Sequence, residues 1–153
     1  MTTLPPFFDP KSTPTNVAHL FSGTYAQSID TSYRISIPRG IESVLTKVDR
    51  IVLWKSQHVD AIEGTTEAIF NSSVRLDNIP RVGIERIIAL DSIYGNVYVV
   101  TLSSSRITIP RPLVSQVSFE KNVVIVGMGT FFHIWPAGNY EAFHKRPGKE
   151  PPA

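Results

Sequence analysis

The chain has 153 residues, the length of one compact domain or of two tightly fused halves. Hydrophobic residues make up 42% of the sequence and charged residues 18%, which is typical of a folded protein rather than a disordered one. The absence of cysteine excludes thiol catalysis, disulfides and cysteine-based zinc sites. A net charge of +2 is too weakly basic to indicate nucleic-acid binding by itself.

Prolines mark both ends of the chain, so residues 1–17 and 145–153 are expected to form extended or mobile tails. The first residues lack the basic and apolar regions of a secretory signal. No stretch reaches the ~18 apolar residues that a membrane-spanning helix needs. We therefore expect a cytoplasmic protein without a membrane partner.

The first half, residues 18–75, alternates short strands with short helices. FSGTYAQSID predicts a strand and IDTSYR predicts a turn. The order expected after the turn is a strand at 34–38, a helix at 40–47, strands at 50–54 and 59–62, and a helix at 65–71.

A linking segment, residues 76–95, contains the amphipathic spacing of a helix that ends near Gly95. The apolar positions that define this face are Val82, Ile84, Ile87, Ile88 and Ile93.

The second half, residues 96–144, repeats the plan of the first. Strands are expected at NVYVVTL, 106–110, 122–126 and 131–135, with helices at 112–117 and 139–144 and a hairpin turn at Gly127-Met-Gly129. The duplication predicts a small α+β, barrel-like fold built from two copies of one unit.

A repeated phrase ties the two halves together. RISIPR at 34–39 recurs as RITIPR at 106–111, a constant offset of 72 residues. In each copy the isoleucines alternate with the first arginine, so the isoleucines can face a core while the arginine faces outward.

The repeat supplies a duplicated basic set, Arg34, Arg39, Arg106 and Arg111. Arginine suits bidentate contacts with phosphate and guanine. Asp30 precedes Arg34 by four residues across a turn, where its carboxylate can orient the guanidinium. The same residues also fit a solvated strand face with one surface ion pair of little energetic value.

Catalytic motifs are absent from the sequence. The histidines have no metal-ligand spacing, the Ser103–Ser105 run has no nucleophile elbow, and the paired glycines lack a third for a dinucleotide site. His133, in an apolar strand, is expected to be structural, and nothing near Asp60 and Glu63 suggests acid–base work. We predict no enzyme activity, cofactor, metal or small-molecule substrate.

FSGTYAQSIDTSYRISIPRGIESVL resembles the N-terminal half of MraZ proteins, in which an FxGxY-like opening leads to a D-x-x-x-R turn and a strand ending in proline. ERIIALDSIYGNVYVVTLSSSRITIPRPL and VVIVGMGTFFHIWPAGNYEAF are similar to the second half of that family, including a VGxG turn and a tryptophan before proline. The resemblance covers roughly residues 20–144.

The resemblance implies two fused SpoVT-AbrB-like units that form a double-split β-barrel with short helices. It implies a nucleoid-associated transcriptional regulator of division and cell-wall genes that binds double-stranded DNA as a ring-shaped homo-oligomer. The family's D-x-x-x-R motif places Asp30, Arg34 and Arg106 at the DNA, while Arg39 and Arg111 either contact the DNA backbone or cap the helix that follows.

The second copy departs from the family motif, because Leu102 stands where the aspartate belongs. In the family a basic residue and a glycine usually precede the arginine. These two positions hold Ser32 and Tyr33 in the first copy, and Ser104 and Ser105 in the second. Lost lysines remove phosphate contacts, and lost glycines disfavour a positive-φ turn. The first copy is therefore expected to be the better DNA contact. The alternative function is an oligomeric protein-interaction module with weakened DNA binding.

Overall fold

The computed structural model describes residues 20–145, so the predicted tails lie outside the described residues except for Lys145. The first repeat contains strands β1 (Thr24–Ser28), β2 (Arg34–Ser36), β3 (Arg50–Lys55) and β4 (Ile62–Thr66), with helices α1 (Arg39–Glu42) and α2 (Glu67–Ser73). The second contains β5 (Val97–Thr101), β6 (Arg106–Thr108), β7 (Asn122–Gly127) and β8 (Phe132–Pro136), with α4 (Arg111–Gln116) and α5 (Ala137–Lys145). Helix α3 (Gly83–Tyr94) lies between them.

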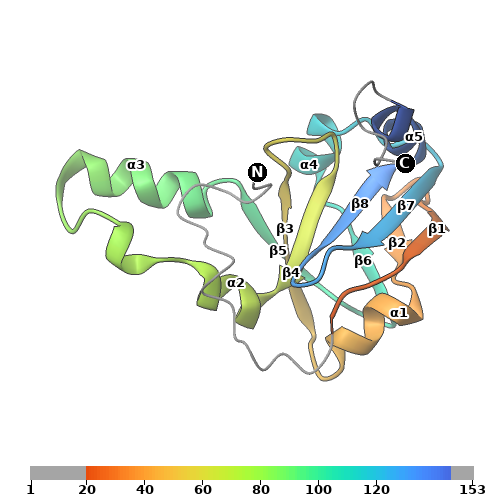
Figure 1. Cartoon of the computed structure of the whole chain (residues 1–153), viewed down its shortest axis with the longest axis horizontal. Helices are drawn as coiled ribbons and strands as arrows, with labels where there is room; N and C mark the ends of the chain where they lie inside the picture. Colours follow the sequence, from red (N-terminus) through yellow and green to blue (C-terminus); the bar gives the residue numbers. More distant parts are fainter. Residues whose placement is uncertain (1–19, 146–153) are drawn as a thin grey trace, which may run out of the picture.

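The architecture is α+β, as predicted, and its strands form two antiparallel sheets (Figure 1). Six strands form one sheet in the order β1-β7-β8-β4-β3-β5, and β2 pairs with β6 in a separate ribbon. Within residues 20–145 the strand ladders do not close into a single barrel, so the double-split barrel stays a prediction.

The strands of the two repeats are interleaved. Strand β1 of the first repeat pairs with β7 of the second, and β5 of the second repeat pairs with β3 of the first. The first strand of each repeat is therefore hydrogen-bonded to the other repeat. Exchanging every strand for its counterpart in the other repeat reverses the order of the large sheet and leaves it otherwise unchanged. The repeat boundaries at residues 75 and 96 stay a prediction.

The repeated isoleucines fill the space between the ribbon and the large sheet. Ile35, Ile37, Ile107 and Ile109 are all at most 5% exposed and belong to one core cluster. Burying an isoleucine side chain stabilises a fold by about 1.5–3 kcal/mol. The alternation of apolar and polar residues in the repeated phrase therefore fixes which face of each ribbon strand points outward.

The predicted fourth strand was wrong in position. Residues 57–60 form bends, and β4 begins at Ile62 and ends at Thr66, where α2 starts. The sequence of this strand does not alternate apolar and polar residues. Its polar side chains can be buried because each has a hydrogen-bond partner in the interior. Glu63 bonds to Trp54 and His133, and the Thr65 hydroxyl donates to the Thr130 carbonyl oxygen.

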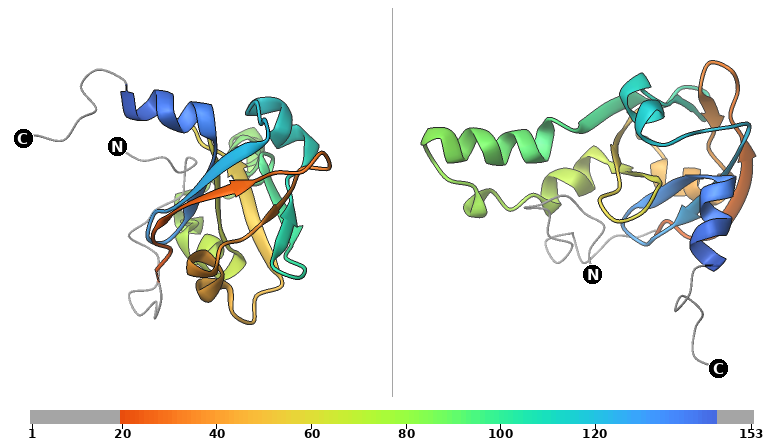
Figure 2. Two further views of the ribbon diagram at one scale, coloured as in Figure 1. Left: turned by 90° about the vertical axis from the view of Figure 1, so that its right-hand side faces the viewer. Right: turned by 90° about the horizontal axis from the view of Figure 1, so that it is seen from above.

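The predicted linking helix exists as α3, but most of its apolar face is not buried. Ala89 and Ile93 pack against Trp54 and its neighbours, whereas four other apolar side chains are 61–78% exposed. Those four are Val82, Ile84, Ile87 and Ile88, here called the α3 apolar face. Helix α3 extends away from the sheets, as Figure 1 and the right-hand view of Figure 2 show.

Neither α3 nor any other helix in the described part of the chain is long and apolar enough to cross a membrane.

Candidate nucleic-acid interface

The ribbon of β2 and β6 brings the two repeated arginines onto one exposed face. Ile35 lies opposite Ile107 and points inward, while Arg34 lies opposite Thr108 and Ser36 opposite Arg106. Side chains alternate along a strand, so all four flanking residues face outward, and all four are exposed. Arg34 and Arg106 are diagonal neighbours, a relation that places β-carbons about 7–8 Å apart.

Symmetric backbone bonds hold this ribbon in register. The Ile37 N–H donates to the Ser105 carbonyl at 2.7 Å, and the Ile109 N–H donates to the Tyr33 carbonyl at 2.8 Å. Each bond joins one repeat to the residue just before the arginine of the other repeat. The position of each arginine therefore depends on both copies.

The turn before Arg34 is held by Asp30, as the spacing predicted. One oxygen of the Asp30 carboxylate accepts the backbone N–H groups of Ser32 and Arg34, each at 2.9 Å. The other oxygen accepts the Arg34 Nε–H at 2.8 Å. Tyr33 has a positive φ of 62°, so the turn keeps its left-handed residue without a glycine.

These bonds lower the pKa of Asp30. The Arg34 backbone N–H is the largest cause, with further lowering by the Arg34 side chain and the Ser32 N–H. The Arg34 side chain is 52% exposed and the Asp30 side chain is 39% exposed, so their ion pair adds little stability. Its main effect is to orient the Arg34 guanidinium.

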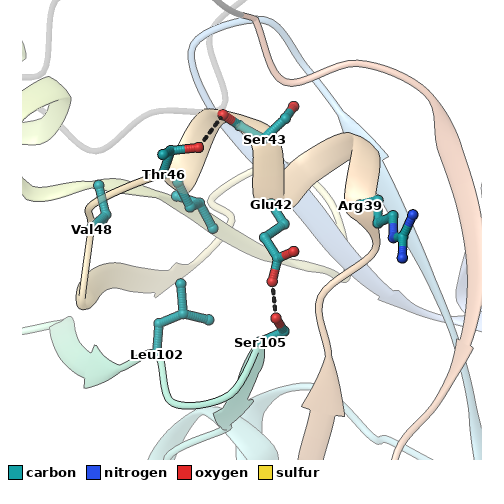
Figure 3. A pocket seen from close by; sticks show the side chains of 8 residues that line it. Arg39, Glu42, Ser43, Thr46, Val48, Leu102 and Ser105 are labelled. Carbon is teal, nitrogen blue, oxygen red and sulfur yellow. Dashed lines mark hydrogen bonds between the residues drawn. The ribbon is translucent and has the colours of Figure 1, made fainter.

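The turn before Arg106 is held differently, since Leu102 cannot supply a carboxylate. Ser103 and Arg106 exchange two backbone hydrogen bonds of 2.9 and 3.0 Å, and the Leu102 N–H donates to the Asp49 carbonyl at 2.8 Å. The Ser105 hydroxyl donates to the Glu42 carboxylate of α1 (Figure 3). Within the described residues the Arg106 side chain has no ion-pair partner.

A shallow cavity of about 290 Å³ joins the two arginines. Lys121, just before β7, lies in its wall, as do Asp30, Ser28 and Ser36. No sequence pattern indicates Lys121, because this residue belongs to no motif and the repeat has Asp49 at the matching position. The only available signal was its position beside the start of an expected strand.

The other two predicted arginines begin the helices that follow the ribbon strands. Arg39 of α1 and Arg111 of α4 are both exposed. Arg39 lines a neighbouring cavity with Glu42 and Ser105, and its guanidinium points away from them (Figure 3). Neither arginine lines the cavity between Arg34 and Arg106, and their predicted DNA contacts stay predictions.

The remaining titratable candidates form no second site. His133 and Glu63 are buried together, whereas Asp60 is exposed, so the two acids do not form a pair. Among residues 20–145 no three His, Asp or Glu side chains gather as metal ligands would.

Comparison with known proteins agrees with the sequence resemblance. The family model described as "MraZ protein, putative antitoxin-like" matches residues 102–151. Three curated relatives each bear the name "Transcriptional regulator MraZ". That of Ureaplasma urealyticum serovar 10 is 29% identical over 126 residues, which cover 81% of this chain and 86% of the relative.

The relative from Caulobacter vibrioides (strain NA1000 / CB15N) is 26% identical over 126 residues, covering 80% of this chain and 81% of its own. The relative from Anaeromyxobacter dehalogenans is 26% identical over 133 residues, covering 80% and 88%. The family model matches the last third of the chain, and these relatives match about four fifths of it, so the chain is similar to MraZ proteins over most of its length.

Proposed function

We propose that this protein is a sequence-specific DNA-binding transcriptional regulator that contacts DNA through the β2–β6 ribbon. The observation that supports this most directly is the pair of exposed arginines on one face of a two-stranded ribbon. The major groove of B-DNA admits a two-stranded ribbon, and arginine is the residue that most often reads guanine there. The names of the relatives agree with a role in transcription.

The two arginines have different roles in this proposal. Arg34 is oriented by Asp30, so it suits a directional contact with a base edge or a phosphate. Arg106 and Lys121 have no ion-pair partner among the described residues, so they supply net positive charge to the phosphates. Arg39 and Arg111 flank the ribbon as further backbone contacts.

Assembly is the second part of the proposal. We infer that copies form a ring-shaped homo-oligomer at division and cell-wall genes, each copy being two SpoVT-AbrB-like units in a double-split barrel. The α3 apolar face supports self-association, since exposed β-branched side chains on a projecting helix and at its N-cap are typical of a surface that a partner covers. A ring repeats the ribbon, and multivalency raises avidity by ~10²–10⁴.

The test is a salt titration of binding to DNA from upstream of the protein's own gene cluster. The double variant R34A/R106A is expected to lose affinity and to reduce the slope of log affinity against log salt by about 2, because each lost phosphate contact removes about one unit. The matched control R86A/K145A removes the same charge from α3 and α5. Equal binding by both variants and the parent would refute the assignment.

The runner-up function is an oligomeric protein-interaction module. Leu102 favours this function, because it stands where the DNA-binding motif has a carboxylate. The α3 apolar face favours it as well, because exposed apolar side chains offer a protein-binding surface. This function predicts a slope near zero for the parent protein in the same titration.

A further inference from the structure

We propose that Glu42 of α1 replaces the missing turn aspartate of the second repeat and acts as the positioning residue for Arg106. This inference rests on the proposed DNA-binding function of the ribbon. It assigns to one repeat the carboxylate that the other repeat lacks. Nothing in the local sequence around Arg106 indicates this role, since Glu42 lies 64 residues earlier.

The contact that supports the proposal joins helix α1 to the second turn. The Ser105 hydroxyl donates to the Glu42 carboxylate, and both side chains are half-buried (Figure 3). The backbone of Glu42 is held by the residues that precede it, since its N–H donates to the Pro38 carbonyl at 2.8 Å and Ile41 is fully buried. The carboxylate is thus presented to the turn by a fixed backbone.

The turn needs an external partner because of its backbone shape. Ser104 and Ser105 both have positive φ, at 51° and 62°. Residues other than glycine adopt this conformation at an energetic cost. In the first turn the Asp30 carboxylate accepts three hydrogen bonds that compensate such a cost. At the matching position Leu102 packs against the core cluster instead.

The chain of contacts leads directly to the ribbon. Ser105 accepts the Ile37 N–H through its carbonyl and precedes Arg106 in the chain. Fixing the Ser105 hydroxyl therefore fixes the backbone from which the Arg106 side chain projects. Because the carboxylate binds a hydroxyl rather than the guanidinium, Arg106 stays free to meet a phosphate, unlike Arg34.

The sign of the effect on DNA binding separates positioning from simple charge. Removing a solvated carboxylate beside a DNA-binding face lowers the repulsion of phosphate and raises affinity. Loss of a positioning carboxylate lowers affinity instead. We expect E42A to weaken binding to the upstream DNA roughly fivefold, the amount that about 1 kcal/mol of one lost hydrogen bond represents. The control E120A, an exposed acid beside the first turn, is expected to bind no more weakly than the parent.

Three further measurements make the test specific. E42Q keeps an acceptor oxygen and is expected to retain most of the affinity. S105A is expected to match E42A without adding to it, since both remove the same bond. L102D restores the D-x-x-x-R pattern and is expected to rescue E42A, which loss of folding would not allow.

Hydrogen exchange provides a readout that does not need DNA. The Arg106 N–H donates to the Ser103 carbonyl at 2.9 Å, and E42A is expected to speed the exchange of this amide. Normal exchange in E42A, or affinity at or above that of the parent, would overturn the proposal. If R34A/R106A binds as the parent does, the DNA-binding function fails, and exchange of the Arg106 amide still decides whether Glu42 positions the turn.

Discussion

Glu63 and His133 face each other across the junction of β4 and β8, with Oε2 of the glutamate 2.9 Å from Nε2 of the histidine. The Trp54 indole N–H donates to the other carboxylate oxygen at 2.7 Å. Glu63 is 0% exposed and His133 is 4% exposed. Because β4 belongs to the first repeat and β8 to the second, this buried contact joins the repeats at the centre of the large sheet.

Replacing Glu63 by alanine is expected to lower the free energy of unfolding by about 3–5 kcal/mol, because the buried Trp54 N–H and the imidazole both lose their hydrogen bond to the Glu63 carboxylate. Urea denaturation measures this change. The control is E67A, whose exposed pair with Arg50 is expected to contribute about 0–1 kcal/mol. Equal losses in the two variants would contradict the role of the buried contact.

The Asp30 turn predicts a specific pH dependence. The pKa of Asp30 is lowered below its ordinary value of 3.8. The pair therefore stabilises the turn above that value, and its contribution is lost as the pH falls through the lowered pKa. An NMR titration of the Asp30 carboxyl carbon is expected to have its midpoint below pH 3.8.

In R34A the pKa of Asp30 should rise only part of the way toward 3.8, since the backbone N–H groups of Arg34 and Ser32 still donate to the carboxylate. The lowered pKa of Asp77, which depends on Arg75, should not change and provides the control. A complete return of the Asp30 pKa to 3.8 would show that the backbone bonds do not matter.

The second turn predicts opposite responses to glycine at adjacent positions. Ser104 has a φ of 51°, so S104G relieves a left-handed residue and offsets the entropic cost of glycine. We expect its stability to stay within about 0.5 kcal/mol of the parent, or to exceed it. S103G, at a residue without positive φ, is expected to lose about 0.5–1 kcal/mol. Thermal unfolding compares them, and equal losses would contradict the strained turn.

The α3 apolar face predicts a separation of assembly from folding. I87S changes a side chain that is 63% exposed, so it is expected to lower the mass of the assembly while changing chain stability by about 0.5 kcal/mol or less. I93A, on the buried side of the same helix, is expected to cost about 2–5 kcal/mol. Light scattering and denaturation measure the two effects, and an unchanged mass in I87S would exclude Ile87 from the proposed subunit contact.

Local patterns in the sequence predicted most elements and one of the two turns. The alternation in RISIPR and RITIPR predicted strands with inward isoleucines, and the spacing of Asp30 and Arg34 predicted their pair. These features depend on contacts within a few residues, which a sequence shows directly. The fourth strand was misplaced because Glu63 and Thr65 are polar, and only their partners on β3 and β8 and in the loop before β8 explain why they are buried.

By itself, the sequence determined that this chain is a duplicated α+β unit with an oriented arginine in its first copy. The tertiary structure alone decided that Arg34 and Arg106 share one face, that Lys121 joins them, and that Glu42 reaches the second turn. The reason is that ribbon register and helix placement depend on pairing between residues about 60–90 positions apart. The packing of both repeats into interleaved sheets sets those distances, and no local pattern records them.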